Sequence, residues 1–281
     1  MAYDPPIDRK NPTCILFVFD HSSSMDGGFG GQPGRKKADG VADVANRLLY
    51  DIGIRCSKAG DDVRDYFHIG VVGYGERVGL AFGGQLAGRE LVPMSEVAYH
   101  PLRVETREKL VSDGAGGVVA TTTNFPVWFD PVAKGETPMV QALELARRIA
   151  ADFAAKHPDS YPPTVVHVTD GESTDGDPEP AAAALRSVAT NDGNVLLFNA
   201  HVSGQDVQPL EFPSDEGRLP DDAARLLFRM SSVLPPTIRD AAVKEKYRIG
   251  PETRGFVFNG DLTAVTRFMT IGTQIPVGER G

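Results

Sequence analysis

Cysteine is scarce in this chain of 281 residues, and positive charge is in deficit. The two cysteines, Cys14 and Cys56, are too few for a disulfide framework and favour a reducing compartment. Acidic residues outnumber basic ones by 38 to 29, and a net charge of -9 argues against general binding to nucleic acid. Long apolar runs are missing as well, since no window reaches the roughly 18 apolar residues of a membrane span.

The first residues also lack the basic start and apolar core of a signal peptide. We therefore expect a cytoplasmic protein in which Cys14 packs as a small apolar side chain. A disulfide to Cys56 stays open, because both residues fall at the same end of the predicted sheet. With 41% hydrophobic residues and neither a linker nor an internal repeat, the chain is expected to form a single domain over residues 1–281, with its core at about 14–272.

Short apolar runs alternate with amphipathic segments along the chain. This alternation predicts an α/β fold: a doubly wound, mostly parallel central sheet with one antiparallel edge strand and helices on both faces, as in Rossmann-like proteins. Strands are expected at 14–19, 65–74, 77–82 (the antiparallel edge), 127–129, 164–169, 194–200 and 254–258, and helices at 38–57, 138–156, 180–188, 221–232 and 261–272.

Two segments do not follow this alternation. Residues 26–34 are rich in glycine and are expected to form a mobile loop; they do not match a nucleotide-binding phosphate loop, because Arg35 follows Gly34 and no Ser or Thr follows the lysine pair. Residues 83–126 show no clear period and are interpreted as an embellishment on the domain, in which short strands can occur. That embellishment is either a surface that selects a partner or an irregular cover over the sheet edge.

The most informative stretch is the first predicted strand and the loop after it. An unbroken apolar run, 14–19, suits a strand buried on both faces and ends at Asp20. Ser22 and Ser24 follow at a spacing of two, which gives a D-x-S-x-S pattern. Ligands of open α/β sheets bind beyond such strand ends. One carboxylate and two hydroxyls on one short loop are oxygen donors that suit a cation such as Mg²⁺.

Two later positions complete the candidate site. Thr137 precedes Pro138 at a predicted helix start, where its simplest role is that of an N-cap. Asp170 ends the β-branched run 164–169, as Asp20 ends the first strand. Both loops can lie at the same edge of the sheet as the Asp20 loop.

Together, the pieces Asp-His-Ser-Ser-Ser, Gly-Glu-Thr-Pro-Met and Thr-Asp-Gly-Glu resemble the metal-ion-dependent adhesion site (MIDAS) of von Willebrand factor type A (VWA) domains. The resemblance covers about 14–272 and implies a stand-alone, bacterial-type VWA domain. It implies that Ser22, Ser24 and Thr137 contact the metal directly, while Asp20 and Asp170 act through water or hydrogen bonds. The implied metal is Mg²⁺, with Mn²⁺ or Ca²⁺ as alternatives.

The resemblance implies a metal-dependent protein–protein interaction module, accessory to a bacterial stress, signalling or defence system. Its partner would be a protein that presents a Glu or Asp to the metal, with no nucleic acid, no membrane and no catalytic residue involved. The chain departs from the family in having His21 where a small residue is frequent, and in the length of the 83–126 segment.

Other functional classes fit the sequence less well. A haloacid dehalogenase needs a second Asp where Ser22 stands, and a Rossmann dehydrogenase and a serine hydrolase need glycine motifs that the loop lacks. A metal-dependent hydrolase remains the enzyme alternative, with His21 and His167 as the nearest candidate bases. A second alternative is a structural module whose metal only rigidifies the loops, while the 83–126 surface carries binding.

Overall fold

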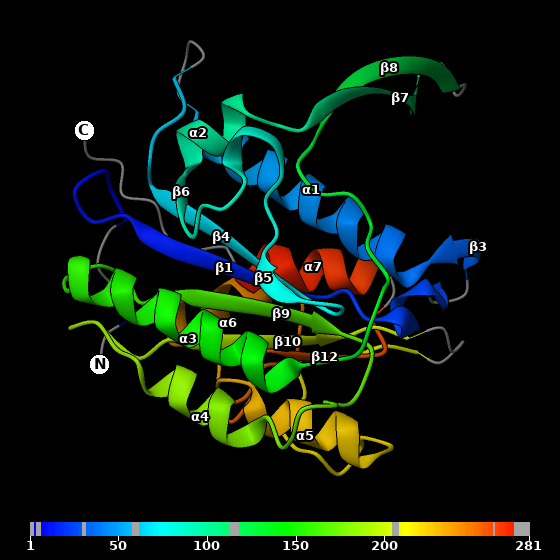
Figure 1. Cartoon of the computed structure of the whole chain (residues 1–281). Helices are drawn as coiled ribbons and strands as arrows, with labels where there is room; N and C mark the ends of the chain where they lie inside the picture. The colour runs from blue at the N-terminus through cyan, green and yellow to red at the C-terminus, as the bar shows by residue number, and fades with distance from the viewer. Residues whose placement is uncertain are drawn as a thin grey trace.

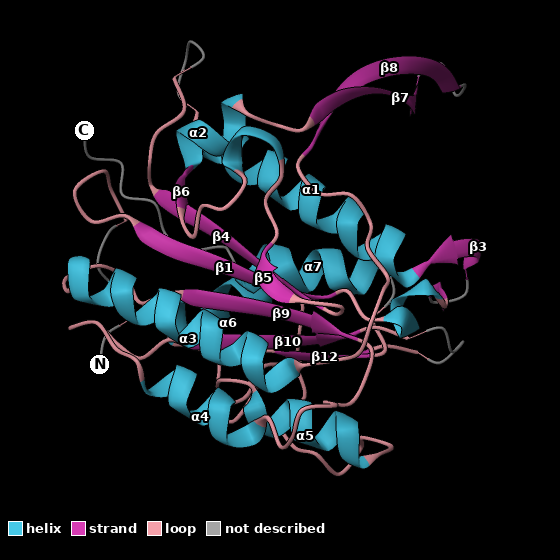
Figure 2. Cartoon of the chain, viewed as in Figure 1, coloured by secondary structure: helices cyan, strands magenta, loops and turns pink. Residues whose placement is uncertain are grey.

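A central sheet with helices on both faces forms the body of the protein (Figures 1 and 2). The computed structural model describes residues 3, 7–29, 32–57, 62–112, 118–203, 208–260 and 262–272. Five parallel strands make the centre of the sheet: β1 (Thr13–Asp20), β4 (Phe67–Tyr74), β9 (Thr164–Thr169), β10 (Leu196–His201) and β12 (Phe256–Phe258). The strand order is β11-β12-β10-β9-β1-β4-β5. The predicted fold class is confirmed.

Short antiparallel strands close both edges of the sheet. The expected edge strand is β5 (Val78–Leu80), which pairs with β4. Two more strands were not placed in advance: β6 (Val92–Pro93), in the segment where short strands were allowed for, also pairs with β4, and β11 (Leu210–Glu211) pairs with β12 at the opposite edge. Strands of two residues carry too short a pattern to be recognised in a sequence.

The helices form two layers, one on each face of the sheet. Strand β1 is buried on both faces, so its alternate side chains pack against opposite layers. Its odd-numbered side chains pack with α1 (Lys37–Cys56), α2 (Met94–Tyr99), α6 (Pro236–Lys244) and α7 (Leu262–Gly272). Its even-numbered apolar side chains pack with α3 (Met139–Lys156), α4 (Glu179–Ser187) and α5 (Asp222–Met230). Helix α6 was missed: Pro235 and Pro236 were taken only as the end of the preceding helix, whereas proline is well tolerated in a first helical turn.

Other local expectations are revised. The glycine-rich 26–34 segment includes a strand pair, β2 (Gly28–Phe29) with β3 (Gln32–Lys36); Gly30 and Gly31 lie outside the described residues. Cys14 and Cys56 are free and buried, so the disulfide that was left open does not form. Within the described ranges, no helix has both the length and the apolar character that crossing a membrane requires.

The 83–126 segment contains a long β-hairpin that projects from the body (Figures 1 and 2). We call it the arm: β7 (Arg103–Ser112) and β8 (Val118–Val127), paired antiparallel over ten residues each. A short helix, η2 (Gly84–Leu86), and then β6 and α2 precede it. The strand expected at 127–129 is instead the last residue of β8 followed by a loop.

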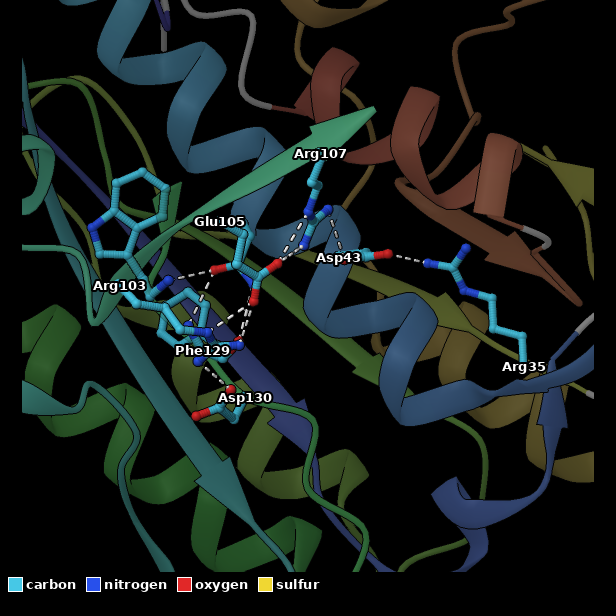
Figure 3. Close-up of polar contacts among 9 residues, drawn as sticks. Arg35, Asp43, Arg103, Glu105, Arg107, Phe129 and Asp130 are labelled. Carbon is cyan, nitrogen blue, oxygen red and sulfur yellow. Dashed lines mark hydrogen bonds and ion pairs between the residues drawn. The ribbon is translucent and has the colours of Figure 1, made fainter. Parts of the chain in front are cut away.

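Charged side chains join the base of the arm to α1 (Figure 3). Arg107 pairs with Asp43 of α1 at 3.2 Å and with Glu105 at 2.9 Å, and its guanidinium lies 3.9 Å from the centre of the Phe125 ring. Asp43 also pairs with Arg35, while Arg103 pairs with Glu105 and with Asp130. These contacts fix where the arm leaves the body.

Candidate functional site

The site is built where the neighbouring parallel strands β1 and β9 end. Phe19 is in register with Val168, so Asp20 lies beside Thr169 and Asp170 follows one residue later. Asp20 is only 1% exposed, and both of its carboxylate oxygens accept hydrogen bonds: Oδ1 from the Ser22 backbone N–H at 2.8 Å and Oδ2 from the Thr169 hydroxyl at 2.6 Å. The strand register therefore places two carboxylates together at one edge of the sheet.

The environment of Asp20 disfavours its charge. Burial raises the pKa of the Asp20 carboxyl, the hydrogen bonds from Ser22 and Thr169 oppose this, and repulsion from Asp170 raises the pKa further. A buried carboxylate that faces a second carboxylate gains from a cation placed between them.

Hydrogen bonds connect the serines of the first loop to Asp170. After β1 the chain enters a 3₁₀ turn, Ser23–Asp26, which places the hydroxyl oxygens of Ser22 and Ser24 2.9 Å apart. The Ser24 hydroxyl donates to Asp170 Oδ1 at 2.7 Å. Ser22 is buried and Ser24 is exposed, so the cluster opens to solvent on the Ser24 side. The structure thus brings together four of the five residues singled out in the sequence.

The fifth residue, Thr137, comes to this edge through the backbone of its loop. Two hydrogen bonds join Ser23 to Gly135: Ser23 N–H donates to the Gly135 carbonyl at 2.9 Å, and Gly135 N–H donates to the Ser23 hydroxyl at 3.0 Å. Lys134 N–H donates to the His21 carbonyl at 2.5 Å. Thr137 itself is 6% exposed. Hydrogen bonds within the described residues connect the Thr137 loop to the Asp20 loop, but none joins the Thr137 hydroxyl to the other four side chains.

The interpretation of Thr137 as an N-cap is wrong. Helix α3 begins at Met139, and Pro138 occupies the N-cap position. The Pro138 side chain makes no capping hydrogen bond. Asp175, from the loop after β9, caps it instead, since its carboxylate accepts from the backbone N–H groups of Val140 and Gln141 at 3.0 Å each. The Thr137 hydroxyl is therefore not used at the helix start.

Glycine makes the close approach of these loops possible. Gly135 has φ +90°, and a Cβ there would lie 2.2 Å from the backbone nitrogen of Glu76. A Cβ on Gly75 would lie 2.5 Å from the Lys134 carbonyl oxygen and 2.7 Å from that of His21. Only glycine fits both positions. In the sequence Gly75 indicated a turn and Gly135 belonged to the Thr137 motif, but nothing there indicated that the two loops approach each other so closely.

Lys37 was also missed. It is the first residue of α1, and its ammonium forms an ion pair with Asp170 Oδ2 in which the two side chains are 13% and 1% exposed. Its sequence position, in a Gly-Arg-Lys-Lys run, suggested only a failed phosphate loop. No short-range pattern links a residue to a partner 133 positions away.

The two histidines that were considered as bases occupy packing positions. The His21 ring lies against β4, where a Cβ on Gly73 would come within 2.4 Å of it, and burial lowers the pKa of His21 to about 4. His167 is fully buried between Tyr74 and Asn199, at 2.6 Å and 2.8 Å. Burial lowers the pKa of His167 to about 4 as well.

The donor set is one of oxygens. In the described parts of the chain, no three of His, Cys, Asp and Glu gather in a metal-binding group. What gathers is two carboxylates with serine hydroxyls, and a threonine on the adjoining loop. Oxygen donors that leave positions for water fit Mg²⁺, or the similar Mn²⁺, better than a metal that prefers nitrogen or sulfur ligands.

Comparisons with known proteins add little. No family model and no curated protein matches the sequence. Among solved structures, proximal thread matrix protein 1 from the mussel byssus has a TM-score of 0.34 at 18% identity, over 69% of this chain and 37% of that one. The N-terminal domains of the type V pili tip protein Mfa5 from Porphyromonas gingivalis have a TM-score of 0.32 at 14% identity, over 58% of this chain and 20% of that one. The human COPII-coat protein Sec24c has a TM-score of 0.32 at 12% identity, over 68% of this chain and 26% of that one. The chain thus spans well under half of each of these proteins, and likenesses of this size identify no family.

Proposed function

We propose that this chain is a VWA-type module that binds a protein partner through a divalent metal, with Mg²⁺ as the metal in the cell. The observation that carries the proposal is the hydrogen-bonded cluster of Asp20, Ser22, Ser24 and Asp170 at the end of two parallel strands. These residues, with Thr137, would hold the metal. The bound metal would supply an electrophilic position that accepts a carboxylate.

The charge balance of the site supports a carboxylate ligand from outside. Its hydroxyl donors are neutral, and Lys37 offsets one of its two carboxylates, so a bound dication would keep one positive charge in excess. A Glu or Asp side chain of the partner then completes the coordination from the open, Ser24 side.

An open groove of about 450 Å³ lies next to Thr137 and supports a macromolecular partner. Its walls come from the loop after β4, the Thr137 loop and the loop after β9. Residues that flank the partner's acidic side chain could lie in this groove. The proposal gives the module no turnover of its own, in line with the packing positions of His21 and His167.

The direct test is metal-dependent stabilisation. Mg²⁺ at 100 times its Kd should stabilise the wild-type fold by about 2.7 kcal/mol. We expect Asp20→Asn to abolish the rise in melting temperature. Asp26→Asn is the matched control: it removes an exposed carboxylate from the same loop and should leave the rise unchanged. A melting curve that millimolar Mg²⁺ or Mn²⁺ does not move in the wild type would refute the metal site.

A second candidate function places binding on the arm. The projecting hairpin and the end of helix α2 before it expose apolar side chains, with Val104 58%, Val119 51% and Tyr99 57% exposed. In this case the metal only orders the loops. A pull-down from lysate distinguishes the two functions: capture that survives both EDTA and Asp20→Asn favours the arm, and capture lost in both favours the metal bridge.

The remaining alternative is a metal-dependent hydrolase. Phosphatase and peptidase turnover, measured with Mg²⁺ or Mn²⁺ and lost in Asp20→Asn, would establish it. We expect no turnover above background.

A further inference from the structure

Lys37 is the unexplained charge of this site. A cation in the first turn of a helix faces the positive end of the helix dipole, which is unfavourable. Lys37 nevertheless occupies the first position of α1 with its side chain only 13% exposed. Asp170 compensates for both costs, because its Oδ2 pairs with the ammonium.

The chain also makes room for this ammonium. A Cβ on Gly27 would lie 3.3 Å from Cε and 3.5 Å from Nζ of Lys37, so the side chain passes directly over the glycine. The backbone N–H of Lys37 donates to the Gly27 carbonyl at 2.9 Å, which holds the start of α1 against the metal-site loop. The preceding residue, Lys36, points elsewhere: its ammonium is exposed and pairs with Asp26 at 2.6 Å.

Both oxygens of Asp170 therefore have partners, Ser24 on Oδ1 and Lys37 on Oδ2. From this geometry we infer that Lys37 is an internal counter-cation of the site, which weakens divalent metal binding and strengthens the capture of a carboxylate by the loaded site. The inference rests on the proposed metal site and concerns how that site is controlled.

The formal charges explain both effects. Asp20, Asp170 and Lys37 sum to one negative charge, so a dication leaves the loaded site one positive charge in excess, and a partner's carboxylate neutralises it. Without Lys37, the metal alone neutralises the site and the carboxylate adds an uncompensated negative charge. Lys37 thus couples the two binding events: it weakens the binding of the metal alone and strengthens the binding of the partner's carboxylate once the metal is bound.

The test compares Lys37→Gln with Lys36→Gln. Each variant removes one positive charge from the same end of α1, but only the first removes the partner of Asp170. Glutamine keeps a donor for Asp170, so the fold should survive; Lys37→Met is the second variant, without any donor. The probe is Mn²⁺ alone, with free ion measured by electron paramagnetic resonance.

We expect Lys37→Gln to tighten Mn²⁺ binding by about tenfold, because a like charge leaves the site. Lys37→Met should also bind Mn²⁺ more tightly than the wild type. Adding Mn²⁺ should raise its melting temperature by more than that of the wild type, since the buried Asp170 of the variant has lost its counter-charge. Lys36→Gln should match the wild type. Affinity in Lys37→Gln that is equal to or weaker than that of the wild type would overturn the inference.

Carboxylate capture is measured with acetate on the Mn²⁺-loaded proteins, through the fall in water-proton relaxation as acetate displaces bound water. We expect acetate to bind Lys37→Gln more weakly than wild type, and equal acetate affinity would overturn the second half of the inference. If neither wild type nor Lys37→Gln binds Mn²⁺, the proposed metal site itself fails. If both bind it equally and Asp20→Asn abolishes binding, the metal site stands and only the role of Lys37 fails.

Discussion

We expect the fold to lose stability steeply as the pH falls from 6.5 to about 4, because one buried and two partly buried histidines must stay neutral in the folded state. Burial is the main cause that lowers the pKa of His21, His167 and His201 to about 4 each. The pKa of each histidine is 6.5 in the unfolded chain and about 4 in the folded one. Between these values the unfolded chain binds more protons than the folded one, so this stability is fully present above pH 6.5 and is lost as the pH falls towards 4.

The magnitude follows from the pKa difference. At pH 5, a histidine with a pKa of 6.5 when unfolded and about 4 when folded reduces the free energy of unfolding by about 2 kcal/mol. His167 is the cleanest case, because it is 0% exposed and both ring nitrogens have partners. Asn199 donates from its amide nitrogen to Ser231 and to the Leu227 carbonyl, so its Oδ1 accepts from His167 Nδ1–H and leaves Nε2 to accept from Tyr74. A proton on Nε2 would break this arrangement.

The assay is urea unfolding at pH 7, 6 and 5, followed by circular dichroism, for wild type and His167→Gln. The variant loses packing and is less stable at every pH, but that loss does not depend on pH. Its decline in stability between pH 6 and pH 5 should be smaller than that of the wild type by about 1.2 kcal/mol, slightly less than the contribution of one full proton. Parallel pH profiles for the two proteins would refute the reasoning, whatever their difference in absolute stability.

Three further substitutions probe how the site and the arm are held. Gly135→Ala places a Cβ 2.2 Å from the backbone nitrogen of Glu76 at φ +90°. It should lower the free energy of unfolding in urea by about 2 kcal/mol or more and reduce the Mg²⁺-induced rise in melting temperature. Gly171→Ala, which has open space around its Cβ, should do neither. Asn46→Leu removes the buried side chain that bonds the backbone at the base of the arm and should cost about 3 kcal/mol; a loss below 1 kcal/mol would contradict this role. Arg107→Gln should change global stability by less than about 1 kcal/mol, since its ion pairs are partly exposed, but should speed hydrogen exchange in β7; unchanged exchange would mean that these pairs do not hold the arm.

The central part of the fold could be predicted because its signals are local. The apolar run that becomes β1 has the length of a buried strand and ends at a charged residue, and β9 repeats that pattern before Asp170. Parallel strands end at one edge, so the convergence of Asp20 and Asp170 follows from the pattern and the fold class alone. Strand β11 and helix α6 were not predicted, and the short strands allowed for in 83–126 were not located, since short elements carry little periodic signal and prolines stand at the start of α6.

The sequence by itself thus determined the sheet, its layers and the residues at the ends of its strands, because buried runs and helical periodicity are written into neighbouring positions. Only the tertiary structure decided what those residues touch. In that structure Asp175 rather than Thr137 caps α3, and the ammonium of Lys37 pairs with Asp170, 133 positions away along the chain. These are contacts between segments far apart in sequence, fixed by packing and charge in three dimensions, and no local pattern records them.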